Sequence, residues 1–180
     1  MKRTRGFTLI EVMIVVAIVT IGAMMATMNF QSWFGHYGAV DFQREFLSQV
    51  NEARTRSMSS SLQHRLLLDL DAERFTLQIG NAGTGSSTWS DTRSSITAER
   101  AAGINDITYT PGPLTLSTGT RAIIFNPGGQ VLIQTNPADN TTVSLFNQAD
   151  VHLTADSLAD RATVRVFGWT SKARLVNGWL

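Results

Sequence analysis

RGFTLIEVMIVVAIVTIGAMMATM, residues 5–28, is the stretch that decides the fold. From position 7 to position 28 it holds one charged side chain, Glu11. At about 1.5 Å of rise per residue, these positions make about 33 Å of helix, long enough to cross the core of a bilayer. Basic residues precede the apolar run, and no small-residue cleavage site of the secretory type follows it. The helix is therefore predicted to remain in the mature protein.

Glu11 is the one feature that a simple signal anchor does not explain. A carboxylate in such a segment costs on the order of 2–3 kcal/mol, so it should have a partner. Cleavage between Gly6 and Phe7 would create an amino group one helical turn away. That amine could pair with Glu11 of the same chain at the lipid interface, or with Glu11 of a neighbour in a bundle of staggered identical helices. The second arrangement would make the carboxylate an assembly signal.

Residues 5–11, RGFTLIE, resemble the class III signal of type IV pilins and type II secretion pseudopilins. The resemblance implies that a prepilin peptidase in the membrane cleaves after Gly6 and N-methylates Phe7. It also implies that Glu11 aligns incoming subunits. Many pilins carry a proline near positions 28 and 29, where the helix is loosened in the filament. This chain has none there, so the resemblance does not extend to that loosening.

The rest of the chain predicts a continued helix and then a β-rich domain. Between positions 40 and 53, apolar residues recur at spacings of three and four, which is typical of an amphipathic helix lying on a globular domain. The predicted segments are a leader at 1–6, a transmembrane and assembly helix at 7–28, its amphipathic continuation at 29–60, and a periplasmic or extracellular β-domain at 61–180. The fold class is α+β and pilin-like, with the long N-terminal helix packed on a mainly antiparallel β-domain.

Short strands separated by turn residues fill the second part of the chain. Residues 81–95 form a polar stretch that predicts an exposed loop. In the turn at 126–129, Pro127 presets the backbone and Gly128 is expected to supply a positive φ. The predicted strands are 62–69, 74–80, 121–125, 130–134, 143–146, 151–153, 163–167 and 173–176.

The sequence IFNPGGQV at 124–131 and the closing segment at 163–176 resemble the GspH/FimT domain. That family pairs the long N-terminal helix with a two-sheet β-domain. Its last hairpin carries a glycine and a basic pair, for which the candidates here are Gly168, Lys172 and Arg174. The resemblance implies a minor subunit of this branch, with an ordinary pilin or another kind of minor subunit as the alternatives.

Composition and motifs argue against catalysis and against metal or cofactor binding. The chain has no cysteine, and its three histidines are scattered, so neither a thiolate nor a histidine metal site is predicted. No nucleophile elbow and no phosphate-binding lysine motif is present, so we expect no enzyme and no cofactor. The leader holds three of the fifteen basic residues, and its removal leaves twelve against fourteen acidic ones. Net charge therefore does not favour binding to nucleic acid.

A local basic patch keeps DNA binding open as an alternative. Arg165, Lys172 and Arg174 lie near the end of the chain, interleaved with Phe167 and Trp169. If these cations share a face of the closing hairpin, they form an aromatic-edged surface of the kind that DNA can use. Some FimT-like proteins are implicated in DNA uptake through this hairpin. The competing interpretation is ion pairing of these cations with aspartates at 156 and 160, with the tryptophans packed on the core.

The sequence thus predicts a minor pilin or pseudopilin without catalytic activity. It would stand in the bacterial inner membrane as a single-pass protein, with its globular domain facing the periplasm, and then enter a filament. The implied partners are other pilin or pseudopilin subunits, the prepilin peptidase, an inner-membrane platform protein with its ATPase and, in the alternative, DNA. A type IV pilus is favoured over a type II secretion pseudopilus because the basic and aromatic tail suits an exposed role.

Overall fold

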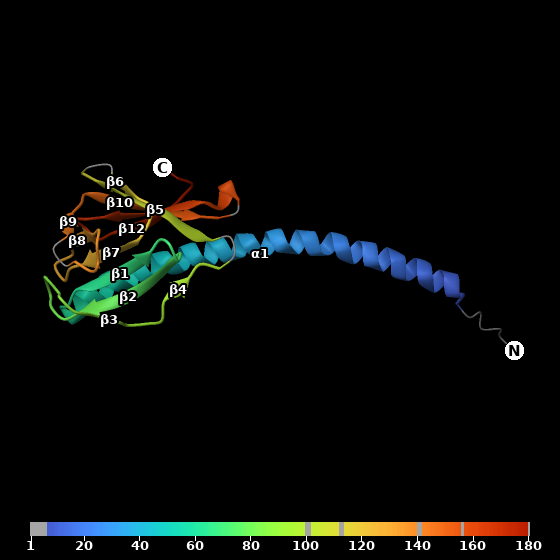
Figure 1. Cartoon of the computed structure of the whole chain (residues 1–180), viewed down its shortest axis with the longest axis horizontal. Coiled ribbons are helices and arrows are strands. Elements are labelled where there is room, and N and C mark those ends of the chain that lie inside the picture. Colours follow the sequence, from blue (N-terminus) through green and yellow to red (C-terminus); the bar gives the residue numbers. More distant parts are fainter. Residues whose placement is uncertain (1–6, 100–101, 112–113, 140–141, 156, 180) are drawn as a thin grey trace. The chain divides into compact units, whose positions relative to one another are not determined.

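A computed structural model describes residues 7–99, 102–111, 114–139, 142–155 and 157–179, without the side chains of 26–34 and of 114. The leader at 1–6, including the predicted cleavage residue Gly6, lies outside the described residues. The chain divides into two compact units, Met1–Phe34 and Gly35–Leu180. One long helix, α1 (Leu9–Ser60), begins in the first unit and ends in the second (Figure 1).

The first unit, from Phe7 onward, consists of the start of α1. All described side chains between positions 7 and 25 are exposed, and most of them are large and apolar. Ile10, Ile14 and Ile18, for example, are each more than half exposed. Within the described residues, no helix meets the combined length and hydropathy criteria for crossing a membrane.

In the second unit, α1 is amphipathic, as predicted. Its buried face follows the helical spacing of three and four, and its apolar members are Ala39, Phe42, Phe46, Val50 and Ala53. Phe46 is fully buried and meets Phe75 edge to face, with ring centroids 5.1 Å apart. This face therefore anchors the helix on the β-domain.

Two antiparallel sheets form the β-domain (Figure 1). The first sheet has the order β3-β2-β1-β7-β8-β9, with β4 also paired to β2. Its strands are β1 (His64–Asp69), β2 (Arg74–Gly80), β3 (Trp89–Asp91), β4 (Ile96–Thr97), β7 (Thr120–Phe125), β8 (Val131–Gln134) and β9 (Val143–Leu145). The strands predicted at 62–69 and 74–80 are confirmed as β1 and β2, and they pair as an antiparallel hairpin with Leu66 opposite Leu77 and Leu68 opposite Phe75.

The second sheet has the order β12-β11-β10-β5-β6. Its strands are β5 (Gly103–Thr110), β6 (Leu114–Leu116), β10 (Gln148–Thr154), β11 (Ala162–Phe167) and β12 (Ala173–Asn177), and the short helix η1 (Leu158–Asp160) lies between β10 and β11. Every described strand pair in both sheets is antiparallel, which confirms the predicted α+β fold class.

Both sheets and α1 contribute to one hydrophobic core. Gly168 connects the sheets directly, because its carbonyl accepts a hydrogen bond from the Val131 amide at 2.7 Å. Its own amide donates to the carbonyl of Asn147 at 3.0 Å. A Cβ at this position would lie 1.8 Å from the carbonyl oxygen of Phe146, so only glycine allows this approach.

Two local predictions need correction, and one strand was missed. The stretch at 81–95 is not a free loop: β3 pairs with β2, and Ser86 is buried where its hydroxyl bonds to Ala82. The strand at 103–110 was not predicted, although it pairs with both β6 and β10. In the turn at 126–129 the positive φ belongs to Gly129 and not to Gly128, because the amide of Gly129 closes the turn on Asn126.

Candidate functional site

The start of α1 forms a capping box around Glu11. The Glu11 carboxylate accepts hydrogen bonds from the amide and the hydroxyl of Thr8, at 2.8 and 2.9 Å, and the Thr8 hydroxyl accepts from the Glu11 amide at 3.3 Å. This reciprocal bonding satisfies amides that the helix itself leaves open. The Thr-x-x-Glu spacing of positions 8 to 11 is a sequence signal for this cap, and it was missed.

The cap engages only half of the carboxylate. Both Thr8 bonds end on Oε2, and Oε1 of Glu11 makes no hydrogen bond with a described residue. Phe7, the predicted first residue after cleavage, is 87% exposed directly before the helix. Glu11 can therefore cap its own helix with one oxygen and accept from a second group with the other.

The hairpin of β11 and β12 forms the second candidate region. Lys172 and Arg174 are both exposed, and they lie two residues apart on one side of the strand segment. The Arg174 guanidinium lies 5.7 Å from the centre of the Phe167 ring. At the turn, Trp169 is 63% exposed, and its indole nitrogen donates to the side chain of Asn147 at 3.1 Å.

Arg165 is brought next to Arg174 but is already paired. The two arginines are directly opposite in the register of β11 and β12. The Arg165 side chain donates two hydrogen bonds to Asp150, both at 2.8 Å, in a bidentate ion pair. These hydrogen bonds raise the pKa of Arg165 above its usual range. The positive face of the hairpin therefore consists of two cations that lack an ion pair with a described residue, Lys172 and Arg174.

The predicted aspartate partners are placed differently. Position 156 lies outside the described residues. Asp160 contacts His36 on α1, with 2.7 Å between Oδ1 and Nδ1, while its carbonyl accepts from Gln43 at 2.5 Å. Arg54 on the same helix donates to the Ser171 hydroxyl at 2.8 Å. The loop before β11 and the turn before β12 are thus both tied to α1.

A buried His–Asp pair lies in the second sheet. His152 Nδ1 and Asp106 Oδ1 are 2.5 Å apart, and the Trp179 ring lies 5.6 Å from the histidine ring. Arg161 covers Trp179 with its guanidinium 4.4 Å from the ring centre. The other histidine nitrogen is buried and has no hydrogen-bond partner among the described residues. The pair therefore joins β5 to β10 as a largely buried polar contact.

No group of three or more potential metal ligands is gathered among the described residues.

Comparison with known proteins supports this architecture. Residues 1–27 match the family model described as the prokaryotic N-terminal methylation motif. The chain also has a structural counterpart in the minor pseudopilin EpsH from the type 2 secretion system of Vibrio cholerae. The match has a TM-score of 0.51 at 12% sequence identity and covers 77% of this chain and 96% of EpsH. A second structure of EpsH from the same organism gives a TM-score of 0.48 at 15% identity, covering 77% and 95% of the two chains. No curated protein sequence matches the chain significantly.

The long N-terminal helix followed by an antiparallel two-sheet domain is a pilin-like α+β fold, and the methylation motif lies at its start. The motif and the fold together support assignment of the chain to the superfamily of type IV pilins and type II secretion pseudopilins. Within that superfamily, the fold of the chain is similar to that of the minor pseudopilin EpsH, a GspH protein.

Proposed function

We propose that this chain is a minor pilin or pseudopilin, a structural subunit that is cleaved after Gly6, N-methylated on Phe7 and incorporated into a type IV pilus or a type II secretion pseudopilus. The observation that carries the proposal is the methylation motif at 1–27, which contains the start of α1, where all described side chains up to position 25 are exposed. Such a surface needs either lipid or other helices to cover it. The subunit supplies contacts, and the assembly ATPase and platform protein supply the work.

Residues 7–28 are proposed to hold the chain in the inner membrane before assembly. The charges at Lys2, Arg3 and Arg5 would keep the leader on the cytoplasmic side. The globular domain would then face the periplasm. Carbonate extraction of membranes tests this placement: the chain should stay in the membrane pellet, and its release into the supernatant would contradict it.

The proposed role of Glu11 is to receive the new amino group of Phe7 from a neighbouring subunit. Its Oε1 is available because both cap bonds use Oε2. In a helix bundle that excludes water, an ammonium beside this oxygen would offset the cost of the buried carboxylate. The amine exists only after the leader has been removed, so assembly would depend on prior cleavage.

Glu11→Gln separates the assembly role from the helix cap. A glutamine side chain can still bond to the Thr8 amide in a capping box, but it carries no charge. We expect Glu11→Gln to insert in the membrane and to be processed, yet to be recovered in filaments at a small fraction of the wild-type level. Thr8→Val is the matched control, because it weakens the cap and keeps the charge. Normal recovery of the Gln variant in filaments would refute the charge pair.

Processing is tested by Gly6→Leu. The variant should retain its leader, which intact-mass measurement shows directly, whereas the wild-type chain should begin with methylated Phe7. A mature, methylated chain from the Leu variant would defeat the proposed cleavage.

DNA binding by the hairpin remains a second candidate for this subunit. Lys172 and Arg174 favour it, since both are exposed beside an exposed tryptophan. Arg165, the third residue of the predicted patch, is occupied by Asp150. This candidate predicts that the chain retains DNA at low salt, that retention falls as salt is raised, and that the double variant Lys172→Ala with Arg174→Ala loses it. Unchanged DNA retention in the double variant would contradict the candidate.

A further inference from the structure

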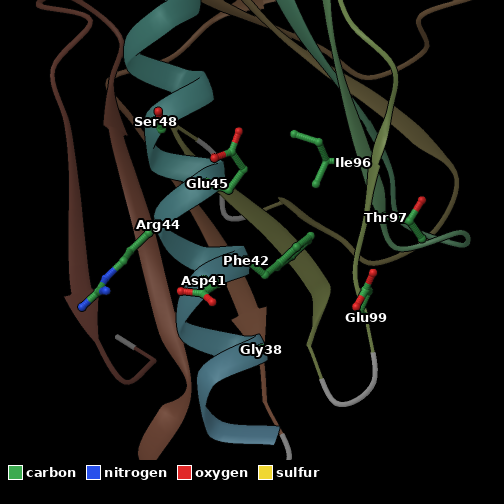
Figure 2. A pocket seen from close by; sticks show the side chains of 9 residues that line it. All are labelled: Gly38, Asp41, Phe42, Arg44, Glu45, Ser48, Ile96, Thr97 and Glu99. Carbon is green, nitrogen blue, oxygen red and sulfur yellow. The ribbon is translucent and has the colours of Figure 1, made fainter. Parts of the chain in front are cut away.

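A groove of about 610 Å³ lies between α1 and the segment containing β4 (Figure 2). Phe42 from the helix and Ile96 from β4 point into it from opposite sides. Three carboxylates, those of Asp41, Glu45 and Glu99, surround these apolar side chains. The groove therefore combines an apolar interior with an acidic margin.

The acidic margin has no ion pair within the part of the chain that the structure describes. None of its three carboxylates forms an ion pair with a described residue, and Glu45 accepts only from the Gln49 amide. Arg44 also lines the groove, so the lining carries three carboxylates and one guanidinium and keeps a net negative charge. By contrast, Asp150 and Glu52 elsewhere in this unit are both paired with arginines. The groove thus presents a local negative charge that suits a basic partner.

Gly38 leaves one end of the groove open. A Cβ at this position would meet no heavy atom within 4 Å, so the space beside it is free. Glycine inside a helix costs about 0.5–1 kcal/mol relative to alanine, and no positive φ requires it here. Its place in the wall of the groove allows another backbone or a large side chain to come close.

The same chain carries a surface of complementary character. The turn and strand of the last hairpin present Trp169, Lys172 and Arg174, which we call the hairpin tip, and all three side chains are exposed. Its cations match the acidic margin of the groove, and its tryptophan matches the apolar interior.

The two surfaces are offset along the helix. Ser171 ties the hairpin tip to Arg54, whereas the groove begins at Gly38 and Asp41. Thirteen residues separate Asp41 from Arg54, which corresponds to about 20 Å along α1. A second copy displaced along the helix axis would bring one surface toward the other. Because the two surfaces differ, the contact would be head to tail, and contacts of this type repeat along a fibre unless the rotation closes a ring.

We propose that the groove between α1 and β4 receives the hairpin tip of a second copy of this chain, with Trp169 against Phe42 and Ile96, and with Lys172 and Arg174 against the acidic margin. This contact goes beyond the proposed filament role, since it lies wholly within the globular unit. It can therefore fail or hold independently of cleavage and of the Glu11 pair.

Disulfide trapping tests the contact on the full-length chain in detergent. The chain has no cysteine of its own, so any disulfide between two copies must involve the cysteines that are introduced. The two variants are Thr97→Cys, at the groove, and Thr170→Cys, next to Trp169 at the hairpin tip. Both positions are exposed. Mixing the two variants under oxidising conditions should give a mixed dimer in clear excess over the homodimer of either one. Equal yields of all three dimers, or no dimer, would overturn the proposal.

Charge reversal tests its chemistry. Adding Lys172→Glu and Arg174→Glu to the hairpin-tip partner replaces attraction with repulsion and should lower the mixed-dimer yield about tenfold or more. Adding Asp41→Lys and Glu99→Lys to the groove partner should then restore it. A single reversal on the hairpin-tip partner provides a matched control: Arg174→Glu should reduce the yield, whereas Arg93→Glu, with the same change in net charge outside the tip and the groove, should not.

The same variants distinguish DNA from a second copy as the occupant of the hairpin tip. If the doubly reversed tip loses DNA retention but cross-links to the groove as the wild type does, the tip is a DNA surface and the proposal is overturned. Loss of cross-linking that the reversed groove restores would establish the protein contact.

Discussion

Gly168→Ala should destabilise the β-domain by separating its two sheets. The added Cβ would lie 1.8 Å from the Phe146 carbonyl oxygen and 2.9 Å from its carbonyl carbon, and Cβ contacts under 3.0 Å are essentially never found. The obstacle is backbone, so no side-chain rotation relieves it. The strand ends must move apart by roughly 1.2 Å or more to bring the shorter contact to that limit.

The displacement acts on two hydrogen bonds at once. They join Gly168 to Val131 at 2.7 Å and to Asn147 at 3.0 Å, and an added 1 Å or so takes either of them out of bonding range. Each is worth about 0.5–1.5 kcal/mol net, and a buried group left unpaired costs about 1–3 kcal/mol. The expected loss in the free energy of unfolding is therefore about 2–4 kcal/mol, a large part of the roughly 5–15 kcal/mol of a typical domain.

Urea unfolding followed by tryptophan fluorescence measures this loss, since Trp89, Trp169 and Trp179 all lie in the β-domain. Gly128→Ala is the matched control, because a Cβ there meets nothing within 4 Å and no positive φ is required. The control should change the free energy of unfolding by less than about 1 kcal/mol, with the denaturant slope unchanged in both variants. If Gly168→Ala is as stable as Gly128→Ala, the close approach at Gly168 and its two hydrogen bonds do not stabilise the packing of the two sheets.

Three other substitutions test separate parts of the fold. Phe46→Ala removes a fully buried ring that meets Phe75 edge to face, so the free energy of unfolding should fall by about 3–5 kcal/mol in urea, against less than about 1.5 kcal/mol for Phe46→Leu. Asp150→Ala leaves Arg165 without its bidentate partner and should cost about 1.5–3 kcal/mol; a thermal midpoint equal to that of the wild type would show that the pair contributes nothing. Burial lowers the pKa of His64 below 6.5, so the unfolded chain binds the proton more readily, and stability should be full above about pH 6.5 and fall below it. The fall between about pH 7 and pH 5 should be smaller in His64→Gln, and an identical pH profile would argue against this origin.

The long helix and most of the first sheet were predictable because their residues follow simple periods. The apolar spacing around Phe46 and the alternation of leucines in β1 each report one buried face. Strand β5 was missed because Asn105 and Asp106 interrupt its apolar residues and favour a turn by composition. Asp106 is buried there because His152, from β10, supplies its partner, and this pairing joins positions far apart in the sequence.

In the candidate site, too, features with a local sequence pattern were predictable, and contacts between distant positions were not. Glu11 stood out in the sequence because a lone carboxylate in an apolar run is costly, and the Thr8 cap had a recognisable spacing. The composition of the last hairpin revealed its cations. It could not show that Arg165 already has an ion-pair partner, because Asp150 reaches Arg165 only when β10 and β11 pair. The groove had no sequence signal, since Phe42 and Ile96 come from separate elements.

The polar ties between α1 and the β-domain determine how a pulling force would be carried. His36 and Gln43 are held by Asp160, and Arg54 is held by Ser171, in addition to the apolar face between them. A tension applied along the helix axis would load these ties together, in shear, instead of opening them one after another. Failure would then require several bonds to break at the same moment, so the domain should follow its helix when the helix is drawn forward.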